Sequence, residues 1–225
     1  MARTPVKDLD DQVELSPRAQ ALLRSAYRVI TRQGSHRLTL QDVADEAGVS
    51  KGMVLYYFQT KENLFLTTMR YALERTGDRI RERIAGADDP QQVIAALVDA
   101  IFIDPERNRD FFLLYIDLIE HAARVPSFSR LSTLSTEIIN GLYEEVIRDG
   151  VARGGLAVDD PAAAAAAMRA QIDGTFLAWL LEADWKASHP RYKAECLRSL
   201  LRLLGAQPAA RTAAVTRRRR EGRRP

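Results

Sequence analysis

Apolar residues recur at intervals of three and four along almost the whole chain, and this spacing constrains the fold more than any other feature. The first such stretch places Ala19, Leu22, Leu23, Ala26 and Ile30 on one side of a helix with 3.6 residues per turn. We find no segment with the alternating pattern of a half-buried strand and no Asn-Gly hairpin turn. The spacing therefore predicts an all-α protein.

Capping residues, glycines and prolines divide this pattern into about nine helices. Ser16 before Pro17, Thr39 before Asp42, and Ser50 are typical residues for the start of a helix. Gly34 ends the first predicted helix. The helices are expected to span about residues 17–34, 40–48, 51 onwards, 61–84, 90–103, 105–123, 126–153, 161–184 and 190–205.

Composition excludes several classes of protein. The single cysteine, Cys196, excludes an internal disulfide and a cysteine-based zinc cluster, and the three histidines are too scattered for a histidine-rich metal site. The longest apolar stretch, residues 93–103, contains Asp99 and is far shorter than the roughly 20 residues that span a bilayer. The N-terminus lacks the apolar core of a signal peptide. We therefore expect a cytoplasmic protein with no metal, no cofactor and no membrane association.

Charge is distributed unevenly, although the formal net charge is only +3. Residues 1–15 carry a net charge of −2, residues 16–58 carry +3, residues 59–204 carry −4 and residues 205–225 carry +6. A basic module ahead of a mildly acidic body suits a nucleic-acid-binding unit that is joined to a unit with another task. A charge of +3 on the first module also arises by chance, so motifs have to decide between these two interpretations.

Residues 39–61, TLQDVADEAGVSKGMVLYYFQTK, have the spacing of a helix-turn-helix. Counted from Leu40 as position 1, Ala44, Gly48 and Val54 stand at positions 5, 9 and 15. The motif needs a small residue where its helices cross, a residue that accepts a positive φ in the turn, and an apolar anchor on the second helix. The N-terminal end of the second helix enters the major groove of DNA in this motif.

The same region resembles the DNA-binding domain of TetR-family transcriptional regulators, which typically reads AGVSxGxxYxxFxxKxxL. The chain has AGVSKGMVLYYFQTKENL at residues 47–64, and the resemblance covers about residues 17–66 strongly. Leu55 and Tyr57 stand where many members have tyrosine and histidine, and the string VLYYF is more similar to the BetI-like branch. The run IDGTFLAWLL at residues 172–181 also resembles that branch. Because leucine cannot hydrogen-bond a phosphate, Tyr56 is the expected contact in place of Leu55.

Eight residues of this region are candidates for DNA contact. The family resemblance implies that Lys61 contacts phosphate, although a solvated surface lysine is the alternative. Thr39 and Ser50 are expected to cap helices and to reach phosphate as well. The side chains that face the groove set base preference, whereas Tyr57 and Phe58 are also typical of a helix-junction core, and Phe58 is interpreted as core. The candidates are Thr39, Ser50, Lys51, Gly52, Met53, Tyr56, Tyr57 and Lys61.

The resemblance also implies that the following helices enclose a small-molecule cavity and that the last two helices pair with a second subunit. Polar or aromatic residues within apolar helical stretches are the candidates for ligand contact, although aromatic residues at helical spacing usually belong to a core. An aromatic cage of Phe176 and Trp179 beside Asp173 could hold a quaternary amine. The candidates are Phe112, Tyr115, Asp117, Asn140, Tyr143, Asp173, Phe176 and Trp179.

These observations favour a ligand-responsive transcriptional regulator, most simply a dimeric repressor that binds a palindromic double-stranded DNA operator and is released by a small-molecule effector. The alternative is a sequence-indifferent architectural DNA-binding protein that uses the basic tail. An enzyme is not expected, because the sequence has no nucleophilic triad arrangement, glycine-rich phosphate loop or metal-ligand spacing. The expected organisation is a flexible arm (1–15), a DNA-binding domain (16–62), a ligand-binding and dimerisation domain (63–205) and a disordered basic tail (206–225).

Overall fold

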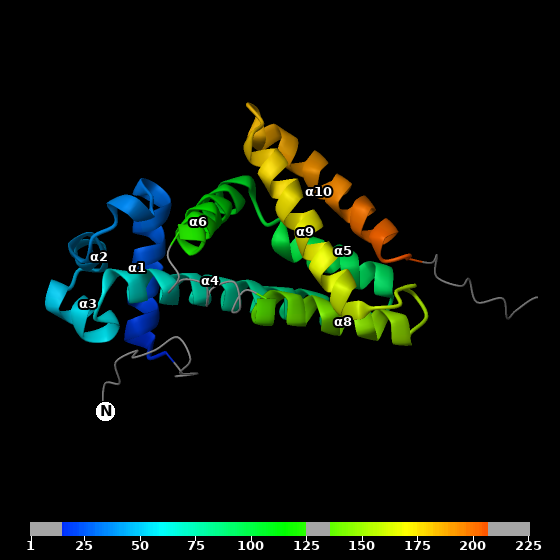
Figure 1. Ribbon diagram of the computed structural model, residues 1–225, viewed down its shortest axis with the longest axis horizontal. Coiled ribbons are helices and arrows are strands. Elements are labelled where there is room, and N and C mark those ends of the chain that lie inside the picture. The colour runs from blue at the N-terminus through cyan, green and yellow to red at the C-terminus, as the bar shows by residue number, and fades with distance from the viewer. Residues whose placement is uncertain (1–14, 125–135, 207–225) are drawn as a thin grey trace, which may run out of the picture.

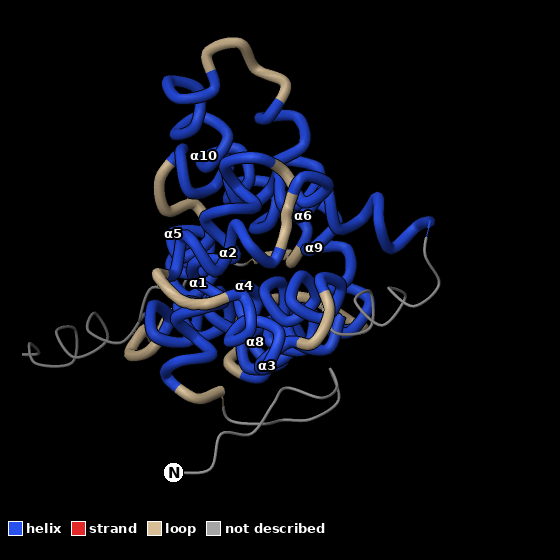
Figure 2. Tube along the Cα trace, turned by 90° about the vertical axis from the view of Figure 1, so that its left-hand side faces the viewer, coloured by secondary structure: helices blue, strands red, loops and turns tan. Residues whose placement is uncertain are grey.

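The computed structural model describes residues 15–124 and 136–206, and within these ranges the chain consists of helices and short connections with no strand (Figures 1 and 2). This architecture confirms the predicted all-α fold. Three predicted features lie outside the described residues: nearly all of the N-terminal arm, the start of a helix at Pro126 and nearly all of the basic tail.

The N-terminal helices form a small unit, the head, at one end of the molecule (Figure 1). It comprises α1 (Pro17–Gln33), the 3₁₀ turn η1 (Ser35–Arg37), α2 (Leu40–Ala47) and α3 (Lys51–Phe58). The apolar stripe of α1 is buried against α2 and the start of α4, so Leu23, Ala26 and Val29 have no exposed surface. Burial of this stripe, at roughly 25 cal/mol per Å² of apolar surface, is the main force that holds three short helices together.

The helix α4 (Lys61–Ile84) is the longest described helix and connects the head to the rest of the molecule (Figure 1). Its N-terminal half buries Leu64 and Met69 in the core of the head. Its C-terminal half buries Leu73 and Ile80 in a second core. One continuous helix therefore contributes to both cores.

The remaining helices form the body. They are α5 (Pro90–Ile101), α6 (Pro105–Arg124), the π-helical turn η3 (Thr136–Asn140), α8 (Gly141–Ala152), α9 (Pro161–Leu180) and α10 (Trp185–Leu203). Helix α9 packs against α8 and α10, and α10 also packs along α5. Figure 1 shows α9 and α10 side by side, directed away from the head.

Two predicted helix boundaries in the body were wrong. Helix α9 ends at Leu180 instead of near Asp184, and α10 begins at Trp185 instead of Pro190, so Pro190 lies inside the helix. Proline is expected in the first turn because it lacks an N–H. Here the indole Nε1 of Trp179 donates to the carbonyl oxygen of Trp185 at 2.6 Å. This contact with α9 holds the turn before the proline in helical form, which local sequence preferences do not indicate.

Candidate functional site

The helix-turn-helix is held together by reciprocal capping bonds. The hydroxyl oxygen of Thr39 accepts a hydrogen bond from the Asp42 amide at 3.1 Å, and the Asp42 carboxylate accepts one from the Thr39 amide at 2.9 Å. Ser50 caps α3 by accepting a bond from the Met53 amide at 3.3 Å. Each cap satisfies backbone groups that would otherwise have no partner at a helix start. The start of the second helix is therefore set by local side chains, as the sequence predicted.

The turn between α2 and α3 contains the three residues that define the motif. Gly48 adopts a left-handed conformation with φ 63° and ψ 41°, which is the conformation that glycine accepts with least strain. Ala44 and Val54 are fully buried, on α2 and α3 respectively. A small side chain at the first position lets the two helices approach closely, and the second position anchors them.

Most of the predicted DNA contacts lie on the open face of α3 and its N-terminal turn. Ser50, Lys51 and Gly52 are exposed, and the ring of Tyr56 retains 44% of its surface. Met53 is half-buried against the head core. The side chain of Tyr57 is only 3% exposed, so its ring packs inside the head beside Phe58.

The predicted phosphate contact Lys61 lies at the start of α4, near the end of α3. It is half-buried, and its Nζ donates to the carbonyl oxygen of His36 at 3.3 Å. A single surface hydrogen bond of this kind leaves two further ammonium hydrogens for other acceptors. Its contact with DNA remains a prediction.

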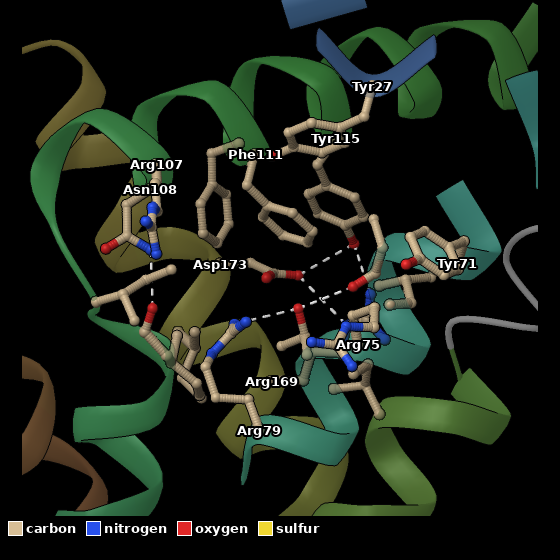
Figure 3. Close-up of a pocket in the computed structure, with 18 of the residues that line it drawn as sticks. Tyr27, Tyr71, Arg75, Arg79, Arg107, Asn108, Phe111, Tyr115, Arg169 and Asp173 are labelled. Carbon is tan, nitrogen blue, oxygen red and sulfur yellow. Dashed lines mark hydrogen bonds and ion pairs between the residues drawn. The ribbon is translucent and has the colours of Figure 1, made fainter. Parts of the chain in front are cut away.

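Between the head and the body lies a cavity of about 800 Å³ (Figure 3). Its wall is formed by α1, the middle of α4, the end of α5, α6, η3, α8 and α9. This volume is within the range that holds small organic ligands. The head helix α1 therefore contributes to the wall, in addition to the body helices that the sequence indicated.

The predicted ligand contacts divide between this cavity and other places. Four of them line it, namely Phe112, Tyr115, Tyr143 and Asp173. Phe176 and Trp179 have no exposed surface and lie in the body core, so the expected aromatic cage does not face the cavity. Asn140 accepts a hydrogen bond from Arg169 at 3.4 Å but is not part of the wall.

A polar cluster occupies the α6–α9 side of the cavity (Figure 3). The guanidinium of Arg169 donates to the Tyr115 hydroxyl at 2.7 Å and pairs with the Asp173 carboxylate at 3.5 Å, and the same hydroxyl lies 3.3 Å from that carboxylate. Burial raises the pKa of Asp173, and Arg169 opposes this rise. The pKa of Tyr115 is raised by burial and by the charge of Asp173. The cluster is therefore a partly buried network whose single carboxylate is already paired.

None of the six arginines in the cavity wall was among the predicted ligand contacts. Arg75 and Arg79 come from α4, and Arg24 comes from α1. In the sequence they look like the solvated charges of amphipathic helices, and no local signal distinguishes them. Tyr27 of α1 was not among the predicted ligand contacts, yet it also lines the cavity, and burial together with the charge of Asp110 raises its pKa to about 12.

Helix α6 contacts both the cavity and the head. Its Leu114 and Leu118 are buried in the head core, while Phe112 belongs to the body core. The carboxylate of Asp117 accepts a hydrogen bond from the Ser35 amide at 3.0 Å, at the start of η1. Asp117 therefore lies at the joint between α6 and the head and does not line the cavity, where it had been expected.

A second contact at this joint is the pair of the His36 ring and the Glu120 carboxylate, at 3.4 Å. Both side chains are largely exposed, so this pair contributes little by itself. The sequence had indicated no special role for His36. The pair extends the contact between η1 and α6 by one further turn of α6.

A helix-turn-helix head joined to a helical body with a cavity defines a ligand-responsive, DNA-binding transcriptional regulator. Comparison with known proteins agrees. Residues 22–68 match the family of bacterial regulatory proteins called tetR, and residues 90–205 match the C-terminal part of BetI-type transcriptional repressors. The chain belongs to the TetR family and, within it, to the group with a BetI-type C-terminal region.

Individual relatives support this assignment. The chain is 31% identical to the transcriptional regulator BetI of Brucella canis over 53% of its own length and 61% of the relative, which is less than two thirds of that protein. It is 28% identical to the transcriptional repressor KstR2 of Rhodococcus jostii over 67% of its length and 75% of the relative. A transcriptional regulator from Saccharomonospora viridis, solved in complex with choline, has the same fold, with a TM-score of 0.69 at 22% identity, covering 81% of this chain and 94% of the other.

In the part of the chain that the structure describes, no group of three or more histidine, cysteine, aspartate or glutamate side chains is placed to hold a metal ion. None of the helices in residues 15–124 and 136–206 is long and apolar enough to cross a membrane.

Proposed function

We propose that the chain is a homodimeric repressor that binds a palindromic operator through α3 and releases it when a small-molecule effector occupies the cavity. The observation that carries this proposal is the position of α6. One face of this helix lines the cavity, and its Leu114, Leu118 and Asp117 contact the head. An effector that shifts α6 changes the position of the head, because α6 lines the cavity with some side chains and packs against the head with others.

Exposed leucines on α9 and α10 support dimerisation. Leu177 and Leu181, one turn apart at the C-terminal end of α9, are 47% and 88% exposed, and Leu203 at the end of α10 is 42% exposed. Covering such apolar side chains with a second copy removes them from water, which favours association. Pairing through these helices places two heads on one dimer, so that they read half-sites about one DNA turn (roughly 34 Å) or a multiple of it apart.

Within the head, the proposed DNA contacts are the exposed groups around α3. Lys51 and Tyr56 are exposed and are proposed to contact the major groove of the operator DNA. The backbone amides at the start of α3 are proposed to bind the DNA phosphates. Thr39, Gly52 and Lys61 flank them as further contacts, with Met53 as a half-buried neighbour.

Release of the operator follows from differential binding. The dimer has one conformation whose heads match the operator spacing and another whose heads do not. An effector that binds the second conformation more tightly than the first shifts the population toward the second. Both α4 and α6 join the cavity to the head, so both are proposed to transmit the change. The S. viridis regulator, which has the same fold, was solved in complex with choline, and this supports a small-molecule effector for the present chain.

The direct test is fluorescence anisotropy of labelled DNA from the region upstream of the gene and of its neighbour, titrated with the full chain. We expect Lys51→Ala and Tyr56→Ala each to weaken specific binding by about tenfold or more, the loss of about one charge-assisted contact. Arg148→Ala, which removes an exposed charge on α8, is the matched control and should change nothing. Undiminished binding by the Lys51→Ala/Tyr56→Ala double variant contradicts the proposed DNA-contacting surface.

Dimerisation is tested by light scattering after size-exclusion chromatography. Leu177→Glu combined with Leu181→Glu is expected to give a monomer with weak operator binding. An unchanged dimer shows that another surface pairs the subunits.

Deletion of residues 206–225 distinguishes the proposed repressor from the alternative function. An architectural DNA-binding protein that depends on the basic tail loses most of its DNA affinity on this deletion, whereas a repressor keeps its preference for the operator.

A further inference from the structure

The wall of the cavity is strongly basic. Six arginines line it, against a single acidic residue, Asp173. They come from four helices, α1, α4, α6 and α9, that approach one another only in the folded protein, as Figure 3 shows for four of the arginines near Asp173. The six are Arg24, Arg28, Arg75, Arg79, Arg107 and Arg169.

Only half of these charges have a carboxylate partner. Arg28 pairs with Glu46 at 2.7 Å, Arg107 with Asp104 at 3.3 Å, and Arg169 with Asp173 at 3.5 Å. For Arg24, Arg75 and Arg79, no carboxylate lies within 4.0 Å among the residues that the structure describes. The cavity therefore has an excess of positive charge, and its one carboxylate is already engaged by a guanidinium and by the Tyr115 hydroxyl.

Two of these three arginines lie on consecutive turns of α4. Arg79 is half-buried and held in place, because its Nε donates to the carbonyl oxygen of Ala100 at 2.7 Å and its Nη2 donates to the Thr76 hydroxyl at 3.3 Å. Burial and the charge of Arg75 lower the pKa of Arg79. Like charges one turn apart on a helix destabilise each other. An anion placed between them removes this repulsion and gains charge-assisted hydrogen bonds.

Much of the remaining wall is apolar. Phe111, Phe112, Ile139 and Ile172 face the same space from α6, η3 and α9. A ligand made only of charged groups would leave these side chains without contacts, and one without charge would leave the arginines without a counter-ion. The wall suits a molecule with both parts.

We propose that the effector is an amphipathic anion, whose carboxylate or phosphate binds between Arg75 and Arg79 and whose apolar part lies against Phe111, Phe112 and Ile172. This inference rests on the proposed function in taking the cavity as the effector site. The proposed ligand differs in charge from choline, the cation with which the S. viridis regulator was solved. A quaternary amine in this cavity would lie near three arginines that have no carboxylate partner, and the one carboxylate of the wall is already paired.

The test compares probes that share one apolar tail and differ in the sign of the head group. Decanoate, decyl phosphate and decyltrimethylammonium, each below its micellar concentration, and choline are titrated into the full chain by calorimetry and by thermal shift. We expect decanoate, decyl phosphate or both to bind and to raise Tm, with weaker binding at higher salt. The comparison of decanoate with decyl phosphate shows which head group the site prefers.

Variants on α4 localise the binding. Arg75 is exposed and makes no hydrogen bond or ion pair with the other residues that the structure describes, so Arg75→Gln is expected to fold normally and to weaken anion binding about tenfold or more. Arg79→Gln should do the same. Arg83→Gln is the matched control, because this arginine follows on the same helix, outside the cavity wall, and should bind like the natural chain.

The proposal is overturned if neither anion binds, if decyltrimethylammonium or choline binds more tightly than both anions, or if Arg75→Gln binds anions as Arg83→Gln does. These measurements need no DNA. Anion binding that depends on Arg75 but leaves operator affinity unchanged supports the inferred ligand class of the cavity and contradicts its role in the proposed repressor. Failure of the natural chain to bind the operator in the absence of any effector contradicts the proposed function without changing the ligand result.

Discussion

The joint between α6 and the head makes a quantitative prediction for Asp117. Its carboxylate accepts a hydrogen bond from the Ser35 amide at 3.0 Å, and Ser35 is only 3% exposed. Asp117→Ala leaves this buried amide without its charged acceptor, which costs about 1.5–3 kcal/mol. For a chain of this length, each kcal/mol lowers Tm by about 2–4 °C, so we expect a decrease of about 3–12 °C. Asp117→Asn keeps an accepting oxygen and should lose less.

The control for this prediction is Glu120→Ala, one turn further along α6. Its pair with His36 at 3.4 Å is largely exposed, so its removal should cost less than about 1 kcal/mol. Both variants are measured by differential scanning calorimetry. A loss for Asp117→Ala no larger than the loss for Glu120→Ala would refute the reasoning that burial of the Ser35 amide makes this bond important.

The same variant tests the route from the cavity to the head. If the bond to Ser35 transmits the effector's signal, Asp117→Ala should reduce the effector-induced change in operator affinity by about tenfold, equivalent to about 1.4 kcal/mol of coupling free energy. Operator affinity is measured with and without the effector by anisotropy. An undiminished response assigns the coupling to α4 instead.

Three further predictions concern stability. Phe176 is fully buried between two phenylalanine rings whose centroids lie 4.3 and 3.8 Å away. Phe176→Ala should lower the free energy of unfolding in urea by about 3–5 kcal/mol, whereas Leu113→Ala, at an exposed position, should lower it by less than about 0.5 kcal/mol. Equal losses would be incompatible with the packing described. Gly48→Ala should lower stability by about 1 kcal/mol through its backbone conformation alone, since an added Cβ meets nothing within 4 Å. Gln59→Gly should raise stability by a similar amount, because it relieves a φ of 61°. Changes of the opposite sign in thermal unfolding would count against this view. Burial lowers the pKa of His189, so protons bind the unfolded chain preferentially below about pH 6.5. The stability that the neutral His189 contributes should be fully present above that pH and should fall as the pH decreases toward the folded pKa. His189→Gln should show a shallower fall, and identical pH profiles of the two proteins would exclude this contribution.

Much of the fold and part of the site were predictable from neighbouring residues. The caps at Thr39 and Ser50, the left-handed Gly48 and the buried pair of Ala44 and Val54 all depend on partners a few residues away. The start of α10 was not predictable in this way. There a bond from another helix holds a turn in helical form ahead of a proline.

The candidate cavity was predictable only in part. Tyr115 and Asp173 were identified as polar groups within apolar stretches, and both line it. Phe176 and Trp179 carry the same signal and lie in the core instead, because periodicity identifies the inner face of a helix and does not distinguish a packed interior from a cavity wall. Arg75 carries the signal of a solvated surface residue, although α1 and α6 enclose the space beside it.

The sequence by itself determined the class of fold, the helix-turn-helix and the family, because each of these follows from caps, spacing and side-chain types that act over a few residues. The tertiary structure alone decided the charge of the cavity and the connection between the cavity and the head. Both depend on groups far apart in the chain: Tyr115 lies 58 residues from Asp173, and Ser35 lies 82 residues from Asp117. Such contacts are set by the angles and heights at which whole helices pack, and local preferences do not encode these.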